Sequence, residues 1–281
     1  MTDEDRLSAC LIKNRDLLSG YGTEIPNPGT YRKSVRILLR TAAREGITEG
    51  ARDVVMQNAN LSFEPERLIL SGPSFFGTPK MAASGAELYS SAEARIGFFL
   101  QMFPNDRLEL FIAIRNPATF LPAVLGATGL TSMTEYLRGG DPTSIRWSHL
   151  IERLNAAFPD IPLTVWCNED TPLIWAQIMR EMAGLDPTVA LEGEFALLEE
   201  IMTEPGLQRF NSYVGSHPGM TEIQKRRVIA AFLDKFADEE AIEEELDVPG
   251  WTEEMIDHMT ELYDEDVYAI ERMSGVNLIT P

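Results

Sequence analysis

Residues that bind metals or form cross-links are scarce in this sequence. Among 281 residues there are two cysteines, Cys10 and Cys167, and three histidines, which lie far apart along the chain. Two cysteines are too few for a disulfide framework, so we expect two buried thiols in a protein of the reducing cytoplasm. Because the histidines and cysteines match no zinc-binding spacing, we expect no metal site.

Positive charge is scarce as well. The chain has 24 lysines and arginines against 44 aspartates and glutamates, which gives a formal net charge of −20. This charge repels polyanions and argues against binding to nucleic acid or to an anionic membrane surface. The same charge favours a basic protein as partner.

Long apolar runs are missing too. No stretch comes near the roughly 18 consecutive apolar residues that a membrane-spanning helix needs. The first residues, Met1 to Arg6, are acidic and lack the basic and then apolar layout of a signal peptide. Hydrophobic residues nevertheless make up 44% of the chain, enough for a core without disulfide or metal. We therefore expect a cytoplasmic globular protein.

The middle of the chain alternates apolar runs with amphipathic stretches. The apolar runs, which predict strands, cover 67–71, 108–114 and 163–167. The amphipathic stretches, which predict helices, cover 86–103, 147–158 and 172–183. Strands and helices that alternate with short joints are typical of a parallel sheet. The pattern predicts an α/β protein in which a parallel sheet lies between two layers of helices.

Helical patterns precede and follow this unit. They cover 6–18, 31–45, 221–236 and 252–273. The last third of the chain is rich in acidic residues, and no internal repeat or long glycine/serine linker divides the sequence. We therefore expect a single domain over 1–281, with an α/β core at 1–200 and a mainly helical layer at 201–281.

The best candidate site is the tripeptide Arg115-Asn116-Pro117. It directly follows the run at 108–114, so it lies at the carboxyl end of a predicted parallel strand, where open α/β sheets bind ligands. An arginine can donate two parallel hydrogen bonds to a phosphate or sulfate. Pro117 suits the first turn of a helix, whose free N–H groups also favour an anion. Alternatively, Arg115 pairs with one of the many carboxylates of the chain.

A family resemblance includes this tripeptide. The sequence RIGFFLQMFPNDRL at 95–108, followed by the apolar run and by IRNP at 114–117, resembles the bacterial sulfotransferase-like family of the P-loop nucleotide-binding fold. In that family a helix ending in L…FP precedes a buried strand that runs into R-(D/N)-P. Two flanking stretches resemble the helix after its phosphate loop and its later helix–strand–helix unit, namely KNRDLL at 13–18 with Gly22 and Pro26, and residues 147–185.

The resemblance implies a bacterial transferase. Its reaction moves a sulfuryl group from 3′-phosphoadenosine-5′-phosphosulfate (PAPS) to a hydroxyl or amine acceptor, without a metal. By this resemblance Arg115 contacts the 3′-phosphate, and Asn116 shapes the turn beside it. The family also brings a late basic loop over the 3′-phosphate, and the candidates for it here are Lys225, Arg226 and Arg227.

The basic cluster 225–227 has two interpretations. In a transferase it closes over the nucleotide, and His217, the histidine nearest to it in sequence, is a weak candidate for the general base. Alternatively, the cluster is the solvated face of the predicted helix 221–236 and pairs with nearby acids.

The sequence also departs from the family. Members begin with a strand and a glycine-rich loop that carries a lysine, whereas residues 2–6 contain neither glycine nor lysine. A serine that usually holds the 3′-phosphate is replaced by Ala123. Two functions therefore remain open: an active transferase, and a catalytically inactive relative that binds a basic partner through its acidic surface.

Other candidate motifs are weaker. The segment Gly72–Lys80 follows a predicted strand as a phosphate loop does, but its lysine comes two residues late and Pro79 removes an N–H, so we expect a surface connection. The acidic runs 243–245 and 264–266 lie in helical stretches, where consecutive side chains point in different directions and cannot share one ion.

Overall fold

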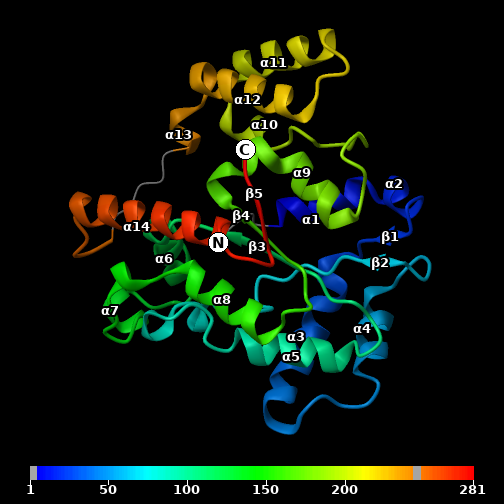
Figure 1. Cartoon of the computed structure of the whole chain (residues 1–281), viewed down its shortest axis with the longest axis vertical. Helices are drawn as coiled ribbons and strands as arrows, with labels where there is room; N and C mark the ends of the chain where they lie inside the picture. The colour runs from blue at the N-terminus through cyan, green and yellow to red at the C-terminus, as the bar shows by residue number, and fades with distance from the viewer. Residues whose placement is uncertain (1–4, 243–247) are drawn as a thin grey trace.

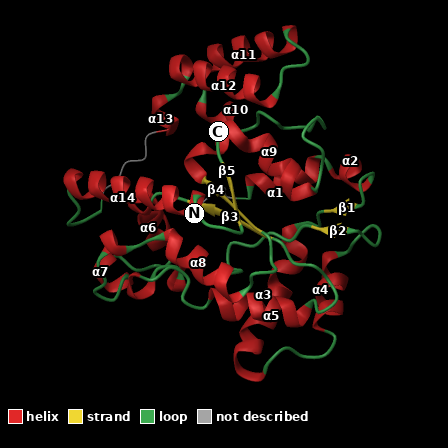
Figure 2. Cartoon of the chain, viewed as in Figure 1, coloured by secondary structure: helices red, strands yellow, loops and turns green. Residues whose placement is uncertain are grey.

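The strands form two short parallel sheets, of which the larger lies near the centre of the molecule and the smaller toward one side (Figures 1 and 2). The computed structural model describes residues 5–242 and 248–281. The larger sheet has the order β3-β4-β5, and the smaller one pairs β1 with β2. The strands are β1 (Thr23–Glu24), β2 (Arg67–Leu68), β3 (Leu110–Ile114), β4 (Leu163–Cys167) and β5 (Val276–Ile279). The predicted mixture of helices and parallel strands is therefore confirmed.

Helices surround both sheets. The N-terminal ones are α1 (Arg6–Lys13), α2 (Arg15–Ser19), α3 (Pro28–Glu45), α4 (Ala51–Ala59) and α5 (Ala92–Met102). The middle ones are α6 (Pro117–Gly126), α7 (Met133–Tyr136), α8 (Trp147–Ala157) and α9 (Thr171–Ala183). The C-terminal ones are α10 (Leu198–Ile201), α11 (Glu204–Ser216), α12 (Glu222–Phe236), α13 (Glu239–Ile242) and α14 (Glu253–Glu271). Single turns of 3-10 helix lie at Pro79–Met81, Ser84–Ala86, Pro142–Ser144 and Asn168–Asp170.

The larger sheet is covered on both faces. On one face Ile112 and Val165 join a core with helices α3 to α6, α8 and α14. On the other face Trp166 and Ile279 join a second core with α1, α2 and α9. Alternate residues of each strand thus point into different cores, as in a sheet between two helical layers.

The apolar run at 67–71 does not join this sheet. Only Arg67 and Leu68 are in a strand, and they pair with Thr23 and Glu24 rather than with β3. The prediction of a single sheet that contains all three apolar runs is therefore wrong. β1 lies in the turn-rich segment before Pro26, where so short a strand leaves no period-two pattern to recognise.

The C-terminal region contributes a strand as well as helices. β5 runs parallel to β4, with Leu163 opposite Val276 and Trp166 opposite Ile279. It follows Gly275, whose φ of 84° turns the chain after α14. The expectation of a mainly helical layer at 201–281 did not include this strand. Helices α10 to α12 form a small core of their own, around Leu198, Met202, Phe210 and Ile229.

The first predicted helix, 6–18, is interrupted at Asn14. The side-chain amide of Asn14 donates to the carbonyl of Cys10 and to that of Glu192, at 2.9 Å each. The side-chain oxygen of Asn14 accepts from the N–H of Glu192 at 2.8 Å. An asparagine that bonds to a distant backbone segment competes with helix continuation. The helix therefore divides into α1 and α2.

Within residues 5–242 and 248–281, no helix is both long enough and apolar enough to cross a membrane.

Candidate functional site

Arg115 lies at the carboxyl end of β3, as the sequence predicts, but it is packed inside the protein. Its side chain is buried, with 7% of the residue exposed, and its Nε donates to Oγ1 of Thr119 at 2.8 Å. Its carbonyl accepts from Nε1 of Trp147 at 2.7 Å, and the residue has at least one further contact. The arginine therefore holds β3, α6 and α8 together.

Asn116 forms the turn between β3 and α6. Its Oδ1 accepts from the N–H of Ala118 at 2.9 Å, so it caps the helix that Pro117 begins. Its Nδ2 donates to Oγ1 of Thr260 in α14 at 2.9 Å. One of the helix N–H groups that could bind an anion is thus used by the chain itself.

Two carboxylates follow β4 at the same edge of the sheet. Oε1 of Glu169 accepts from the N–H of Asn116 at 2.8 Å, and its Oε2 accepts from the hydroxyl of Tyr263 at 3.0 Å. Burial raises the pKa of Asp170, and the neighbouring Glu169 raises it further. The carboxyl edge of the sheet therefore carries two acidic residues, of which Glu169 bonds to the residue next to Arg115, and their negative charge opposes the binding of an anionic ligand there.

The sequence motifs do not single out Glu169, Asp170 or Tyr263 as site residues. Glu169 and Asp170 follow the apolar run at 163–167 as Arg115 follows the run at 108–114, and this placement is the signal that could have identified them. Burial also raises the pKa of Tyr263, and the nearby Glu169 adds to the rise, so its hydroxyl stays protonated and donates to Glu169.

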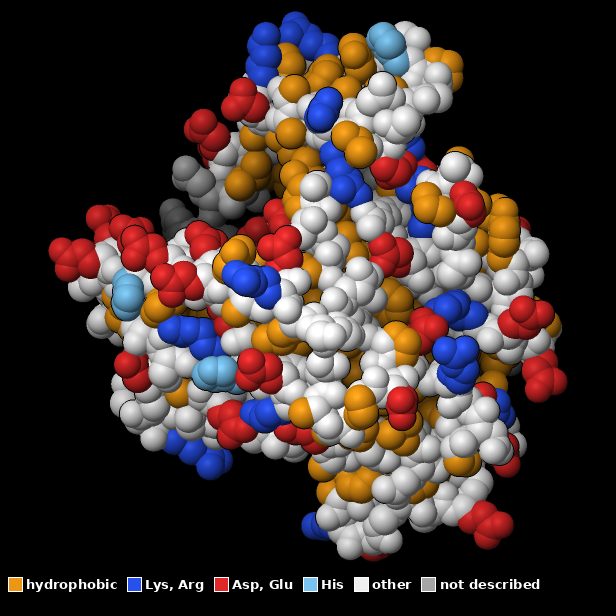
Figure 3. All heavy atoms as spheres, in the orientation of Figure 1, with side chains coloured by type: hydrophobic (Ala, Val, Ile, Leu, Met, Phe, Trp, Pro, Cys, Tyr) orange, Lys and Arg blue, Asp and Glu red, His pale blue; other side chains and the backbone are white. Residues whose placement is uncertain are grey.

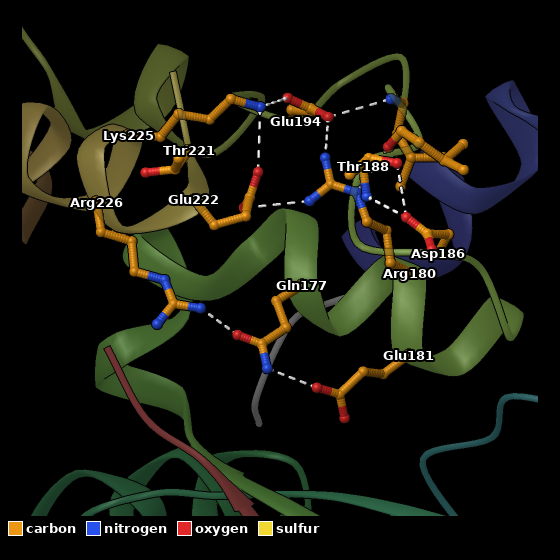
Figure 4. A network of polar contacts seen from close by, with 12 residues as sticks. Gln177, Arg180, Glu181, Asp186, Thr188, Glu194, Thr221, Glu222, Lys225 and Arg226 are labelled. Carbon is orange, nitrogen blue, oxygen red and sulfur yellow. Dashed lines mark hydrogen bonds and ion pairs between the residues drawn. The ribbon is translucent and has the colours of Figure 1, made fainter. Parts of the chain in front are cut away.

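Lys225 is part of an ion-pair network that joins α12 to α9 (Figure 4). Its Nζ lies 2.9 Å from Oε2 of Glu194 and 3.2 Å from Oε1 of Glu222. Arg180 of α9 pairs with the same two carboxylates, and the side chains of Arg180 and Glu194 are only 4% and 9% exposed. Two cations and two anions thus neutralise one another, with Arg180 and Glu194 buried and Lys225 and Glu222 partly exposed.

Arg226 and Arg227 differ in their surroundings. Arg226 donates to Oε1 of Gln177 in α9 and, at 3.0 Å, to the carbonyl of Thr280 just after β5. Arg227 is exposed on the next position of α12. His217 ends α11, where its Nδ1 lies 2.8 Å from the carbonyl of Tyr213 and its ring stacks on that tyrosine.

The structure keeps these candidates in separate places. Arg115 and Asn116 contact α6, α8 and α14, whereas the basic cluster of α12 contacts α9 and the chain end. Among the described residues, no hydrogen bond or ion pair joins the two groups. The alternative interpretation, in which the α12 cations pair with nearby acids, describes Lys225.

The segment Gly72–Lys80 packs through aromatic rings. A Cβ on Gly72 would lie 2.4 Å from the ring of Phe75, so a glycine is needed for this approach. Phe75 in turn meets Phe99 edge to face, with ring centroids 5.0 Å apart. Lys80 is exposed at the far end. The glycine therefore serves close packing of the segment.

A cavity of about 1040 Å³ lies between the two sheets. It is bordered by β2 and its continuation to Ser71 on one side and by β3 on the other. Arg115 is not among the residues that line it, although Ala123 of α6 is. This cavity is therefore apart from the arginine that the sequence singles out.

Acidic runs were expected not to bind metal. Asp264 and Glu265 are exposed on α14, whereas Asp266 is buried and bonded to α8. The run 243–245 and residues 2–4 lie outside the described residues. Among those described, no group of three or more histidines, cysteines, aspartates or glutamates is placed to hold a metal ion.

Comparison with known proteins finds no family model, no curated protein and no solved structure that matches the chain.

Proposed function

We propose that this chain is a binding protein that meets a basic protein partner through the acidic face of α14. The observation that carries the proposal is the opposite use of the two signs of charge. Arg115, Lys225 and Arg226 bond to the chain's own groups, whereas the carboxylates of α14, apart from the buried Asp266, are exposed. Outward negative charge attracts positively charged partners and speeds their association.

The acidic face is formed by side chains on one helix. Its exposed carboxylates are Glu253, Glu254, Asp257, Glu261, Asp264, Glu265 and Glu271. Figure 3 shows acidic side chains gathered over this helix. Its opposite face is buried through Met259, Tyr263 and Ile270. The helix is therefore fixed on the core and presents these charges on a defined surface.

The test compares two variants of equal charge. One variant replaces Asp257, Glu261, Asp264 and Glu265 of α14 by the corresponding amides. The other makes the same kind of change at four exposed residues of the N-terminal part of the chain, Glu45, Glu49, Asp53 and Glu64. A lysine-rich peptide is titrated into each at low and at physiological salt. We expect weaker binding only for the α14 variant, because localised charge and not net charge sets the affinity. Equal weakening by both variants would contradict the proposal.

Sulfuryl transfer from PAPS is a second candidate, favoured by the place of Arg115 at the carboxyl end of a parallel strand. The described residues do not fit PAPS as they stand, because Arg115 is buried and the carboxylate of Glu169 bonds to the backbone of the neighbouring Asn116. Calorimetry with adenosine 3′,5′-bisphosphate tests this candidate. Binding that is lost in Arg115→Ala, but kept when the exposed Arg227 is changed to alanine, would favour it over the first proposal.

A further inference from the structure

Among residues 5–242 and 248–281, no strand pairs with the edge of β3 that faces away from β4. The N–H of Leu110 donates to the carbonyl of Pro162 at 2.9 Å, and Leu110 pairs with Leu163. In a parallel pair, alternate residues direct both backbone groups to the same neighbour. The backbone groups of Phe111 and Ala113 therefore point the other way, toward the cavity that both residues line.

β2 presents a matching edge from the other side. The N–H of Arg67 donates to Gly22 at 3.2 Å and that of Ile69 to Glu24 at 2.9 Å, so these residues bond toward β1. Leu68 and Leu70 alternate with them and direct their N–H and C=O groups away from β1. Both leucines line the same cavity.

Burial supports an open edge. All five residues of β4 are buried, whereas in β3 only Ile112 and Ile114 are. A strand covered by helices on both faces is normally buried throughout, so the partial exposure of β3 comes from its free edge. Backbone N–H and C=O groups left without partners inside a protein are costly, and a free edge is a template for another strand.

The cavity also has the side walls that a strand requires. Phe99 and Ala123 line it from the helices on one face of the sheets, and Trp175 and Met182 line it from α9 on the other. Side chains that alternate above and below a strand would meet apolar groups on both faces. At the amino end, Nη1 of Arg67 pairs with Oε2 of Glu109 at 2.6 Å, which fixes the two sheets relative to each other.

We propose that this cavity receives one extended polypeptide segment, parallel to β2 and β3, that is joined to the chain ahead of Met1. It would merge the two sheets into one, in the order β1-β2-segment-β3-β4-β5. The segment is mainly apolar, since both of its faces are covered. This inference does not depend on the proposed function.

The position of Asp5 identifies the N-terminal side as the source. Asp5 lines the cavity, and its carboxylate pairs with Arg32, with both oxygens of Asp5 bonded at 2.6 and 2.5 Å. Nε of Arg32 donates to the carbonyl of Ser71, just after β2, at 2.8 Å. The chain at Asp5 thus lies at the carboxyl edge of the sheets.

The direction of the following helices agrees with this source. From Asp5, α1 and α2 carry the chain back to Thr23, where β1 begins opposite Arg67. A segment that ends near Asp5 and is followed by helices and then by the parallel strand β1 forms a strand–helix–strand unit. Such a segment has to run parallel to β2 and β3.

The test extends the full chain at its N-terminus. One extension, KVIIVVG, can form a strand; the matched control, KVPIPVG, has the same length but lacks two N–H donors and cannot pair along both edges. We expect amide exchange at Leu68, Leu70, Phe111 and Ala113 to be slower by roughly tenfold or more with the first extension than with the control or without extension. The protein with the KVIIVVG extension should also unfold at a higher temperature than the control.

Other outcomes would overturn the proposal. Equal exchange in all three proteins would show that no strand enters. Protection by the KVIIVVG peptide added separately, with none from the fused extension, would assign the cavity to a strand from another molecule. Protection on dimer formation of the unextended chain would assign it to a second copy, and protection by adenosine 3′,5′-bisphosphate would assign it to a nucleotide.

Discussion

The carboxylate of Asp266 accepts a hydrogen bond from the backbone N–H of Trp147, with Oδ2 at 2.6 Å from the nitrogen. The same oxygen lies 3.2 Å from the N–H of Ser148, and Asp266 is only 4% exposed. A residue of α14 thus satisfies the first free N–H groups of α8, where the helix dipole favours negative charge. The middle of the acidic helix is in this way fixed to the α/β core.

We expect Asp266→Ala to destabilise the protein by about 2 kcal/mol, because buried N–H groups of α8 lose a charged acceptor. Urea unfolding followed by circular dichroism measures the change. Asp264→Ala, two residues away and exposed, serves as the control and should shift the free energy of unfolding by less than about 0.5 kcal/mol. Equal effects of the two substitutions would show that the contact with α8 contributes little.

Asn116 allows a similar comparison at the candidate site. Asn116→Ala removes both the cap of α6 and the bond to Thr260, and we expect a loss of about 1–2 kcal/mol. Asn116→Ser keeps an oxygen that can cap α6 but cannot donate to Thr260 of α14. We therefore expect Asn116→Ser to lose less stability than Asn116→Ala. Chemical denaturation of both variants gives the two values. A serine variant as unstable as the alanine variant would place the main contribution in the contact with Thr260.

The sequence predicts the parts of this fold that have strong local signals. The run at 163–167 matches β4 residue for residue, and the helix expected at 172–183 forms one residue longer and ends before Gly184, whose φ of 68° suits glycine. β1 and β5 have two and four residues, too few for a periodic pattern to stand out. The strands were recognisable where they are long and apolar.

The candidate site was predictable in position but not in its contacts. The pattern places Arg115 at the end of a strand, and the structure agrees. Its burial depends on α8 and on Thr119, and the network of Lys225 depends on Glu194, 31 positions away. Long-range partners of this kind leave no signal in local spacing, so a cation meant for a ligand and one used in packing look alike in sequence.

The ion-pair network between α9 and α12 predicts a strong effect of removing one charge. In Glu194→Gln, Glu222 is the one charged partner that Arg180 keeps among the described residues, and we expect the free energy of unfolding to fall by about 3 kcal/mol. Glu192→Gln, at an exposed position two residues earlier, is the control. The double change Arg180→Met with Glu194→Leu should recover much of the loss, because Lys225 and Glu222 still pair and no buried charge is left alone. A double variant less stable than Glu194→Gln would contradict this account.

Cys167 at the end of β4 predicts a loss of stability in alkali. Burial raises the pKa of its thiol to about 11, from an ordinary value of 9.0. Between these two values the unfolded chain releases the thiol proton while the folded chain keeps it, so the free energy of unfolding falls as the pH rises above about 9. The full effect is on the order of 2–3 kcal/mol above pH 11. Urea unfolding at several pH values should show this slope in the parent protein and a shallower one in Cys167→Ala, which also removes the part of the Tyr263 pKa rise that Cys167 causes. Parallel slopes for the two proteins would mean that the thiol titrates alike in the folded and the unfolded chain, and its burial would then have no part in the alkaline transition.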